Sequence, residues 1–121
     1  MSWILIVEDE EEITNFLRYV LEGDNYRVET ATTLAEARER LNVGLPAAIL
    51  LDRGLPDGDG LELCQYLKQY KKPRPPVLVL SARKDSDAIR EGMEAGAVEY
   101  ITKPFQFVSV LSRVRALTAC A

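Results

Sequence analysis

Four short apolar runs, each followed by a polar or charged residue, constrain the fold of this chain more than any other feature. The runs lie at 3–7, 47–51, 77–80 and 100–102, and the residues that follow them are Glu8 with Asp9, Asp52, Ser81 and Lys103. In open sheets of parallel strands, ligands bind outside the carboxyl ends of the strands. If the runs are neighbouring parallel strands, three carboxylates, a hydroxyl and an ammonium therefore meet at one edge of one sheet.

The segments between these runs predict an alternation of strand and helix that repeats five times. Apolar side chains recur at helical spacing within 13–21, 34–41, 63–70, 86–95 and 107–117. Residues 26–30 supply one further strand, and the last of the four runs belongs to a short fifth strand at 99–101. Gly92 weakens the fourth helix. This alternation predicts βαβ units and a parallel sheet covered on both faces. We predict an α/β, flavodoxin-like doubly wound fold with five helices and a five-stranded parallel sheet. Its order, 2-1-3-4-5, is taken from the fold class by analogy.

Polar residues predict where three of the helices begin. Residues 10–12 are glutamates in the expected first turn of the first helix, where the helix dipole favours anions. Thr33 and Glu36 have the spacing of a capping box at the second helix. Asp59 and Glu62 can cap the third helix, after a turn-rich loop.

Length and composition indicate one globular domain, which we predict to span residues 1–121. Hydrophobic residues make up 47% of the chain and charged residues 28%, as in ordinary soluble domains. No apolar run approaches the ~18 residues of a membrane span. Cys64 and Cys120 fit neither a metal motif nor a disulfide scaffold. We therefore expect a cytoplasmic protein without membrane attachment.

The net charge of −4 and the absence of histidine exclude several functions. Phosphate backbones are bound through clustered Lys and Arg, and the densest basic stretch, at 68–74, is interrupted by proline. Direct nucleic-acid binding by this domain is therefore not expected. Without histidine, neither a Ser-His-Asp triad nor an imidazole metal site can form within the chain. A bound metal ion must be a hard ion held by oxygen, which favours Mg²⁺ over Zn²⁺.

The carboxylates of Glu8, Asp9 and Asp52 are predicted to lie within several ångströms of one another. Two unit charges 4 Å apart repel by about 4 kcal/mol at an effective dielectric constant near 20, so the cluster requires a cation. Mg²⁺ takes one or two carboxylates directly and leaves positions for phosphate oxygens. Any one of these acidic residues is explained by a helix start or a turn cap. Together with Lys103 and Ser81, they predict a Mg²⁺-dependent site that accepts a phosphoryl group on Asp52.

The order and spacing of these residues resemble the receiver domains of two-component response regulators over essentially the whole chain. The matching pieces are Glu8-Asp9, Leu51-Asp52, Leu55-Pro56, Asp59-Gly60, Ser81-Ala82, Gly96-Ala97 and residues 100–105. The helical face is most similar to the subgroup that carries winged-helix DNA-binding domains. Each piece is weak alone, but their common order makes the resemblance specific.

The resemblance implies that Asp52 is the nucleophile that takes a phosphoryl group from a phosphohistidine on a sensor histidine kinase. Asp9, Asp52 and the backbone carbonyl of Gly54 would ligate Mg²⁺, with Glu8 contributing directly or through a water. The domain would be a phosphoacceptor that catalyses its own phosphorylation and dephosphorylation, and not a conventional enzyme. The missing histidine agrees, because the donor imidazole must then come from another protein.

The resemblance also implies a switch. Lys103 pairs with the phosphoryl oxygens, and the Ser81 hydroxyl moves to hydrogen-bond the phosphate. Tyr100 then turns inward and reshapes the face made by the fourth helix, fifth strand and fifth helix, which controls an output such as transcription. The Lys103–Pro104 bond is cis in the family.

Some residues depart from the family pattern near the acceptor. Glu8 stands where many receivers have aspartate, which makes its direct contact with the metal ion an open point. Gly54 and Ala82 are small, so water and small phosphodonors are predicted to reach the acyl phosphate easily. Arg83 could partly close this opening.

The helical face departs as well. In the winged-helix subgroup, charged pairs on this face hold the active dimer together. Glu99 and Arg113 could form such a pair, but Ile89, Val98 and Ser109 stand where charges are expected. The resemblance implies that a homodimer through this face would have contacts more apolar than usual.

Other assignments fit the residues less well. Flavodoxin shares the strand order, but the acidic residues at 8–12 would repel a flavin phosphate. A haloacid dehalogenase phosphatase and a Toprim nuclease each need an Asp-x-Asp motif, which is missing after the first and third runs. The alternative that stays open is a pseudo-receiver that binds partners without phosphorylation. Its signature would be the loss of Asp52, Asp9 or Lys103, and all three are present.

Overall fold

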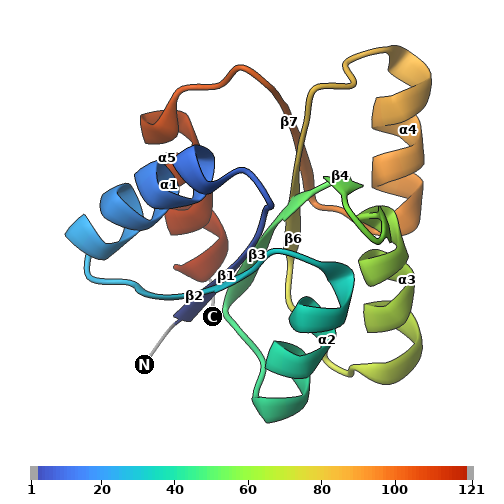
Figure 1. Cartoon of the computed structure of the whole chain (residues 1–121), viewed down its shortest axis with the longest axis horizontal. Coiled ribbons are helices and arrows are strands. Elements are labelled where there is room, and N and C mark those ends of the chain that lie inside the picture. The colour runs from blue at the N-terminus through green and yellow to red at the C-terminus, as the bar shows by residue number, and fades with distance from the viewer. Residues whose placement is uncertain (1–2, 120–121) are drawn as a thin grey trace.

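The computed structural model describes residues 3–119, which form a five-stranded parallel sheet between helices (Figure 1). The elements in chain order are β1 Trp3–Val7, α1 Glu11–Gly23, β2 Arg27–Ala31, α2 Leu34–Val43, β3 Ala48–Asp52, β4 Gly54–Leu55, β5 Gly58–Asp59, α3 Leu61–Tyr70, β6 Val77–Ser81, α4 Ser86–Ala95, β7 Glu99–Thr102 and α5 Phe107–Thr118. None of the helices in this part of the chain is long and apolar enough to cross a bilayer. Cys120 lies outside the described residues.

The order of the sheet is β2-β1-β3-β6-β7, and all neighbours pair in parallel. This confirms the predicted fold, with β6 and β7 as the fourth and fifth strands of the sheet. The short strands β4 and β5 form a separate antiparallel ribbon in the loop that was predicted to be rich in turns. The pairing of Asp52 with Leu80, and of Ser81 with Thr102, brings the carboxyl ends of β3, β6 and β7 side by side.

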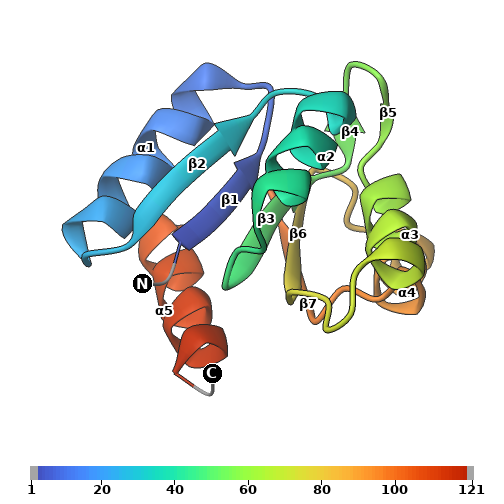
Figure 2. The same cartoon turned by 90° about the horizontal axis from the view of Figure 1, so that it is seen from below.

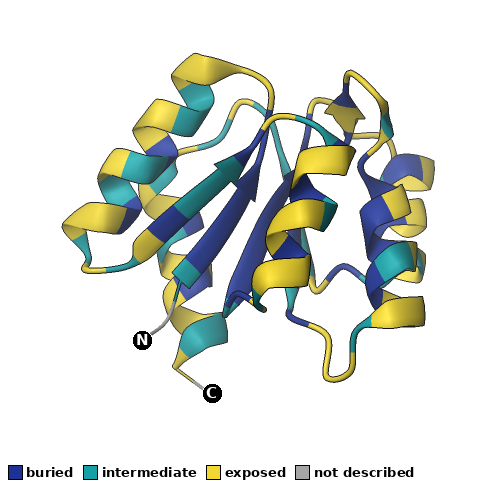
Figure 3. Ribbon diagram, turned by 60° about the horizontal axis from the view of Figure 1, so that its bottom comes forward, coloured by how far each residue is buried: buried dark blue, intermediate teal, exposed yellow. Residues whose placement is uncertain are grey.

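Alternate side chains of the sheet enter two separate apolar cores. On β1, Leu5 and Val7 pack in the core that also contains side chains of α2 and α3, whereas Ile4 and Ile6 pack in the core with α1 and α5. Every residue of β3 and β6 is buried, as expected for strands covered on both faces. Figure 2 shows α1 and α5 on one side of the sheet, and Figure 3 shows the buried strands between largely exposed outer helix surfaces.

The observed helix starts differ from the predicted ones in detail. α1 begins at Glu11, so Glu10 is the N-cap residue and lies outside the first turn. The Thr33 hydroxyl caps α2 by accepting a hydrogen bond from the Glu36 amide (3.1 Å). The Glu36 carboxylate accepts from the Thr32 amide (2.6 Å), where a capping box would use the Thr33 amide. The cap was therefore predicted correctly, but the reciprocal bond is shifted by one residue.

The loop between β3 and α3 is attached to two helices by aspartates. Asp57 accepts hydrogen bonds from the Leu34 amide (2.8 Å) and the Ala35 amide (3.1 Å) at the start of α2. Asp59 accepts from the Leu61 amide (3.0 Å) at the start of α3, as the sequence predicted. Carboxylates at these positions satisfy amides that the helix leaves without partners and favour the positive end of its dipole. The loop that follows Asp52 is therefore held in a defined place.

Candidate functional site

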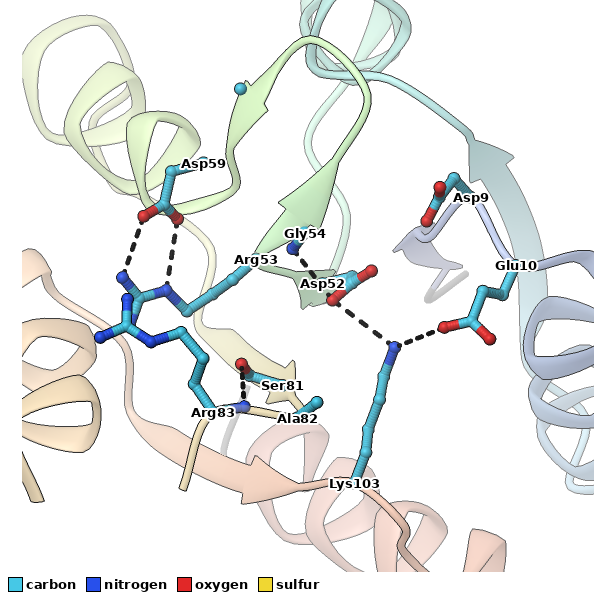
Figure 4. Close-up of a pocket in the computed structure, with 11 residues that line it drawn as sticks. Asp9, Glu10, Asp52, Arg53, Gly54, Asp59, Ser81, Ala82, Arg83 and Lys103 are labelled. Carbon is cyan, nitrogen blue, oxygen red and sulfur yellow. Dashed lines mark hydrogen bonds and ion pairs between the residues drawn. The ribbon is translucent and has the colours of Figure 1, made fainter. Parts of the chain in front are cut away.

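A pocket of about 450 Å³ opens at the carboxyl ends of the central strands (Figure 4). Five of the predicted site residues line it, namely Asp9, Asp52, Gly54, Ser81 and Lys103. The rest of the lining is Glu10, Arg53, Gly58, Asp59, Ala82 and Arg83. The polar residues that follow β1, β3, β6 and β7 therefore gather at one edge of the sheet, as their positions after the apolar runs predict.

Lys103 lies at the centre of the acidic part of this pocket. Its Nζ is 2.9 Å from a Glu8 oxygen, 3.3 Å from a Glu10 oxygen and 3.5 Å from Oδ1 of Asp52. The Lys103 amide donates to the Ser81 carbonyl (2.8 Å), which fixes the start of this segment beside β6. The bond to Pro104 is cis, as the family resemblance implied. A single ammonium therefore faces three carboxylates.

The protonation of these groups follows from burial and from their neighbours. Burial and, to a smaller extent, the nearby charge of Asp52 raise the pKa of Glu8 to about 7, against the opposing effect of the hydrogen bond from Lys103. Burial alone would lower the pKa of Lys103, but the bond to Glu8 and the charge of Asp52 raise it overall. The ammonium is therefore protonated at neutral pH, while the Glu8 carboxyl is near its titration midpoint in the absence of a metal ion.

The donor set fits a hard divalent cation. Carboxylate oxygens of Glu8, Glu10 and Asp52 lie within 4.8 Å of one another. Mg²⁺ prefers oxygen ligands and retains several waters, so a small group of carboxylates beside an open pocket suits it. Among the described residues, this cluster contains two of the predicted ligand residues, Glu8 and Asp52, together with Glu10, which was not predicted.

Glu10 is the site residue that sequence reasoning missed. It was assigned to the first turn of a helix, but it lies before α1, and its amide donates to a Glu8 oxygen (3.2 Å). This local turn brings its carboxylate to Lys103. Asp9, which was predicted to be a direct ligand, is exposed and lines the pocket without belonging to the tight oxygen cluster. A long run of acidic residues after β1 was the only available signal, and it does not indicate which member points inward.

Asp52 ends β3 and is 6% exposed. Its Oδ1 accepts a hydrogen bond from the Gly54 amide (3.2 Å) and lies 3.5 Å from the Lys103 ammonium. A carboxylate at the end of a buried strand has a fixed direction, because the backbone on both sides is held. The carboxylate of Asp52 is therefore oriented before any ligand enters.

The predicted switch residues meet at the backbone of Arg83. The Ser81 hydroxyl accepts from the Arg83 amide (3.0 Å), and the Tyr100 hydroxyl donates to the Arg83 carbonyl (2.8 Å). The Tyr100 ring lies over Gly92 in α4, where an added Cβ would be 2.7 Å from a ring carbon. Gly92, which the sequence suggested as a weak point of the helix, thus provides the space that this ring occupies. The inward turn of Tyr100 stays a prediction.

Arg53 forms the other side of the pocket, opposite Lys103 in Figure 4, and no role was predicted for it. The residue is 6% exposed. Its guanidinium donates to both oxygens of Asp59 (3.3 and 2.9 Å), to Glu91 (3.1 Å) and to the carbonyl of Ala88 (3.1 Å). The hydrogen bonds to Asp59 raise the pKa of Arg53 above its ordinary value. The group is thus a permanently charged part of the structure, held by four hydrogen bonds.

The face of α4, β7 and α5 carries one of the charged pairs that the sequence suggested. Arg113 lies 3.7 Å from Glu99 within one chain. Val98 is 43% exposed, and Ser109 is also exposed, so the expected charges are replaced by small or apolar groups. Dimerisation through this face stays a prediction.

Comparison with known proteins identifies the family. The family model described as the response regulator receiver domain matches residues 4–115. The chain is 44% identical over 115 residues to the KDP operon transcriptional regulatory protein KdpE of Escherichia coli. This alignment covers 95% of the present chain and 50% of that protein. It is 38% identical over 115 residues to the phosphate regulon transcriptional regulatory protein PhoB of Rhizobium meliloti, in an alignment that covers 94% of the present chain and 51% of that protein. The chain therefore spans about half the length of these curated relatives.

Solved structures agree with this result. A response regulator from Chloroflexus aurantiacus has 35% identity and a TM-score of 0.90, with 98% of each chain covered. The beryllofluoride-activated NtrC4 receiver domain dimer has 31% identity and a TM-score of 0.91, also with 98% of each chain covered. The chain belongs to the receiver domain family of two-component response regulators.

Proposed function

We propose that this chain is a phosphoacceptor in which Asp52 takes a phosphoryl group from a phosphohistidine of a sensor histidine kinase. An oxygen of Asp52 attacks phosphorus, the P–O bond forms as the P–N bond breaks, and the imidazole leaves with its electron pair and is protonated. The observation that carries the proposal is the position of the Lys103 ammonium, 3.5 Å from an Asp52 oxygen inside a group of carboxylates.

The chain's own residues would assist this transfer by positioning and charge. Lys103 is placed to neutralise charge on the phosphoryl oxygens, and the Gly54 amide orients the Asp52 carboxylate. The Ser81 hydroxyl can donate to a phosphoryl oxygen once it gives up its bond with the Arg83 amide. Preorganised donors of this kind act where charge develops and need little rearrangement during the reaction.

A Mg²⁺ ion would be held by Asp52 with Glu8 and either Asp9 or Glu10, and by the Gly54 carbonyl. When bound, it would supply positive charge to the transferring phosphoryl group. The support is the chemistry of the donor set, which consists of carboxylate oxygens. Neutralisation of Glu8 and Asp52 by a cation would also relieve the repulsion that now raises the pKa of Glu8.

The small side chains around the acceptor support a short-lived phosphorylated state. Gly54 and Ala82 are exposed at the pocket, so water and small phosphodonors can approach Asp52 from that side. The domain would then catalyse its own dephosphorylation. Arg83 lines the same opening and limits it in part.

The proposed output is a change in the face of α4, β7 and α5, driven by Ser81 and Tyr100. The relatives named above are transcriptional regulators about twice as long as this chain, which supports control of transcription as the output. A DNA-binding output domain of the winged-helix type and a cytoplasmic location are proposed from the family resemblance. The NtrC4 receiver was solved as a dimer in its beryllofluoride-activated form, which supports dimerisation of this chain on phosphorylation. Nucleic-acid binding would belong to the output domain.

Incubation with acetyl phosphate and Mg²⁺, followed by intact mass measurement, tests the assignment. The wild-type chain is expected to gain one phosphoryl group, and Asp52→Asn should gain none. Asp87→Asn, at an exposed position of α4, is the matched control and should behave as the wild type. No mass gain in the wild type would favour the pseudo-receiver alternative, and an undiminished gain in Asp52→Asn would place the acceptor elsewhere.

A further inference from the structure

The side chain of Arg53 connects the loop after the acceptor with helix α4. Two of its hydrogen bonds go to Asp59 in the loop, and two go to α4, through the Glu91 carboxylate and the Ala88 carbonyl. The α3 and α4 helices also form a shallow pocket of about 470 Å³ to which Arg53, Asp59 and Glu91 contribute. The guanidinium therefore lies between the loop that follows Asp52 and helix α4, two elements that are distant in the sequence.

The backbone of Arg53 is bound to the same loop. Its carbonyl accepts hydrogen bonds from the Leu55 amide (3.1 Å) and the Gly60 amide (2.8 Å). The residue directly follows Asp52, so any shift of the acceptor segment moves the Arg53 backbone with it. Because both the main chain and the side chain of Arg53 are bonded, that shift is passed to the guanidinium.

A buried arginine at this position needs a reason. An unpaired charge is costly to bury, and an apolar side chain would fill the space more simply. The planar fork of Arg can bond a carboxylate through two N–H groups and still reach other acceptors, which a lysine ammonium cannot reproduce. The geometry uses this property: Nε and Nη2 donate to Asp59 in the loop, and Nη1 and Nη2 donate to α4.

We propose, on the basis of the function proposed above, that Arg53 is a positioning residue that couples the acceptor loop to α4. A phosphoryl group on Asp52 then acts on the face of α4 through two routes. One is the pair Ser81 and Tyr100, and the other is the ionic contact from Arg53 to Glu91. Glu91 is half exposed, so it can exchange this contact for water when the loop shifts.

The test uses beryllofluoride with Mg²⁺ as the phosphoryl mimic, and NMR of the wild-type chain and its variants. Bound beryllofluoride is measured by its ¹⁹F signal, and the response of α4 by the amide shifts of Glu91 and Gly92. In Arg53→Met and Glu91→Gln, binding of the mimic is expected to persist, while the α4 shift changes fall to half or less of the wild-type values. Arg53→Lys should restore only part of the response.

One control separates this coupling from general effects of charge. Arg90→Met removes a cation from the outer surface of α4, where it pairs with Asp87 (3.0 Å) and Glu94 (3.8 Å), and should leave the response unchanged. A merely structural Arg53 would lower the free energy of unfolding without changing the α4 response per bound mimic.

The outcomes distinguish the two proposals. If the wild type binds no beryllofluoride, the phosphoacceptor function and the coupling both fail. If Arg53→Met and Glu91→Gln bind the mimic and keep the full α4 response, the coupling is wrong and the phosphoacceptor function stands. If Arg53→Met does not fold, Glu91→Gln decides, because it leaves the contact between Arg53 and Asp59 in place.

Discussion

The two sides of the acceptor pocket use charge in opposite ways. On the Lys103 side, one ammonium faces three carboxylates, and the buried Glu8 carboxyl has its pKa raised to about 7. On the Arg53 side, the guanidinium has four hydrogen bonds to the loop and α4, and its own pKa is raised. Both sides are built from Arg or Lys with Asp and Glu, and they line the same cavity.

The difference indicates which charges bind ligands and which maintain the structure. Where carboxylates outnumber cations in a partly buried site, the protein carries a repulsion that a metal ion and a phosphoryl group together can remove. Where each charge already has its partners, a ligand would have to displace them. A surplus of uncompensated charge therefore marks the reactive side, and a balanced network marks the side that holds the loop and α4.

The largest expected effect is on the Lys103 side. Lys103→Gln should lower the rate of phosphorylation by acetyl phosphate about 100-fold, as for the loss of one preorganised donor at a transition state. Lys72→Gln, on the exposed turn after α3, is the control and should retain the wild-type rate. Rates are followed by intact mass. A rate within about twofold of the wild type in Lys103→Gln would remove the functional contrast between the two sides.

The surplus of negative charge should also appear as a pH dependence of stability in the metal-free protein. The folded chain holds the Glu8 proton up to about pH 7, whereas the unfolded chain releases it near its ordinary pKa of 4.5. Because the folded state binds this proton more tightly, the free energy of unfolding falls as the pH rises through that window. At about 1.4 kcal/mol per pKa unit, we expect a loss on the order of 2 kcal/mol between about pH 5 and pH 8.

Urea unfolding in the presence of a chelator measures this loss. Glu8→Gln should remove most of the decline, and Glu12→Gln, on the exposed surface of α1, should keep it. Mg²⁺ should restore stability to the wild type at the higher pH, because it binds the folded state. An equally steep decline in Glu8→Gln would assign the pH dependence to other groups.

A third measurement asks which acidic side chain completes the metal site. The oxygen cluster favours Glu10 over Asp9, so Glu10→Gln should weaken Mg²⁺ binding about tenfold and Asp9→Asn should weaken it less, since each decade corresponds to about 1.4 kcal/mol. Calorimetric titration with Mg²⁺ gives both affinities. The reverse ranking would mean that the Asp9 side chain turns inward when the ion binds, as the family resemblance implied.

The smallest expected effect concerns a carboxylate with its partners already in place. Asp57 caps α2 by accepting from two backbone amides, so Asp57→Ala should lower the free energy of unfolding by about 1 kcal/mol, as for the loss of a helix cap. The phosphorylation rate should stay within about twofold of the wild type, because Asp57 does not line the pocket around Asp52. A large loss of phosphorylation would show that the attachment of the loop to α2 also positions the acceptor.

The sequence was sufficient to predict the strands, the helices and the sheet edge that carries the candidate site, because these follow from the periodicity of apolar residues. The strand order came from analogy with the fold class. The buried strands β3 and β6 are continuous apolar runs, and Asp52 and Ser81 are the last residues of these strands. Parallel pairing then makes their meeting at one edge almost unavoidable. The Lys103–Pro104 segment was found by resemblance to the family, since its cis bond has no signature in local periodicity.

The details that were missed depend on the direction of single side chains. Glu10 and Asp9 are neighbours in one acidic run, and only the turn before α1 brings Glu10 to Lys103. Arg53 follows an apolar strand and reads as an ordinary charged residue at a loop start. Its partner Glu91 is 38 residues away, and no local pattern connects the two positions.

The Tyr100 ring packs against Gly92, in space that a single methyl group at this position would fill. Glycine lowers the stability of a helix interior by roughly 1 kcal/mol relative to alanine, so α4 gives up intrinsic helix stability where the ring rests on it. Gly92→Ala would strengthen the helix and push the ring off it at the same time. The residue at position 92 thus affects both the stability of α4 and the position of the Tyr100 side chain.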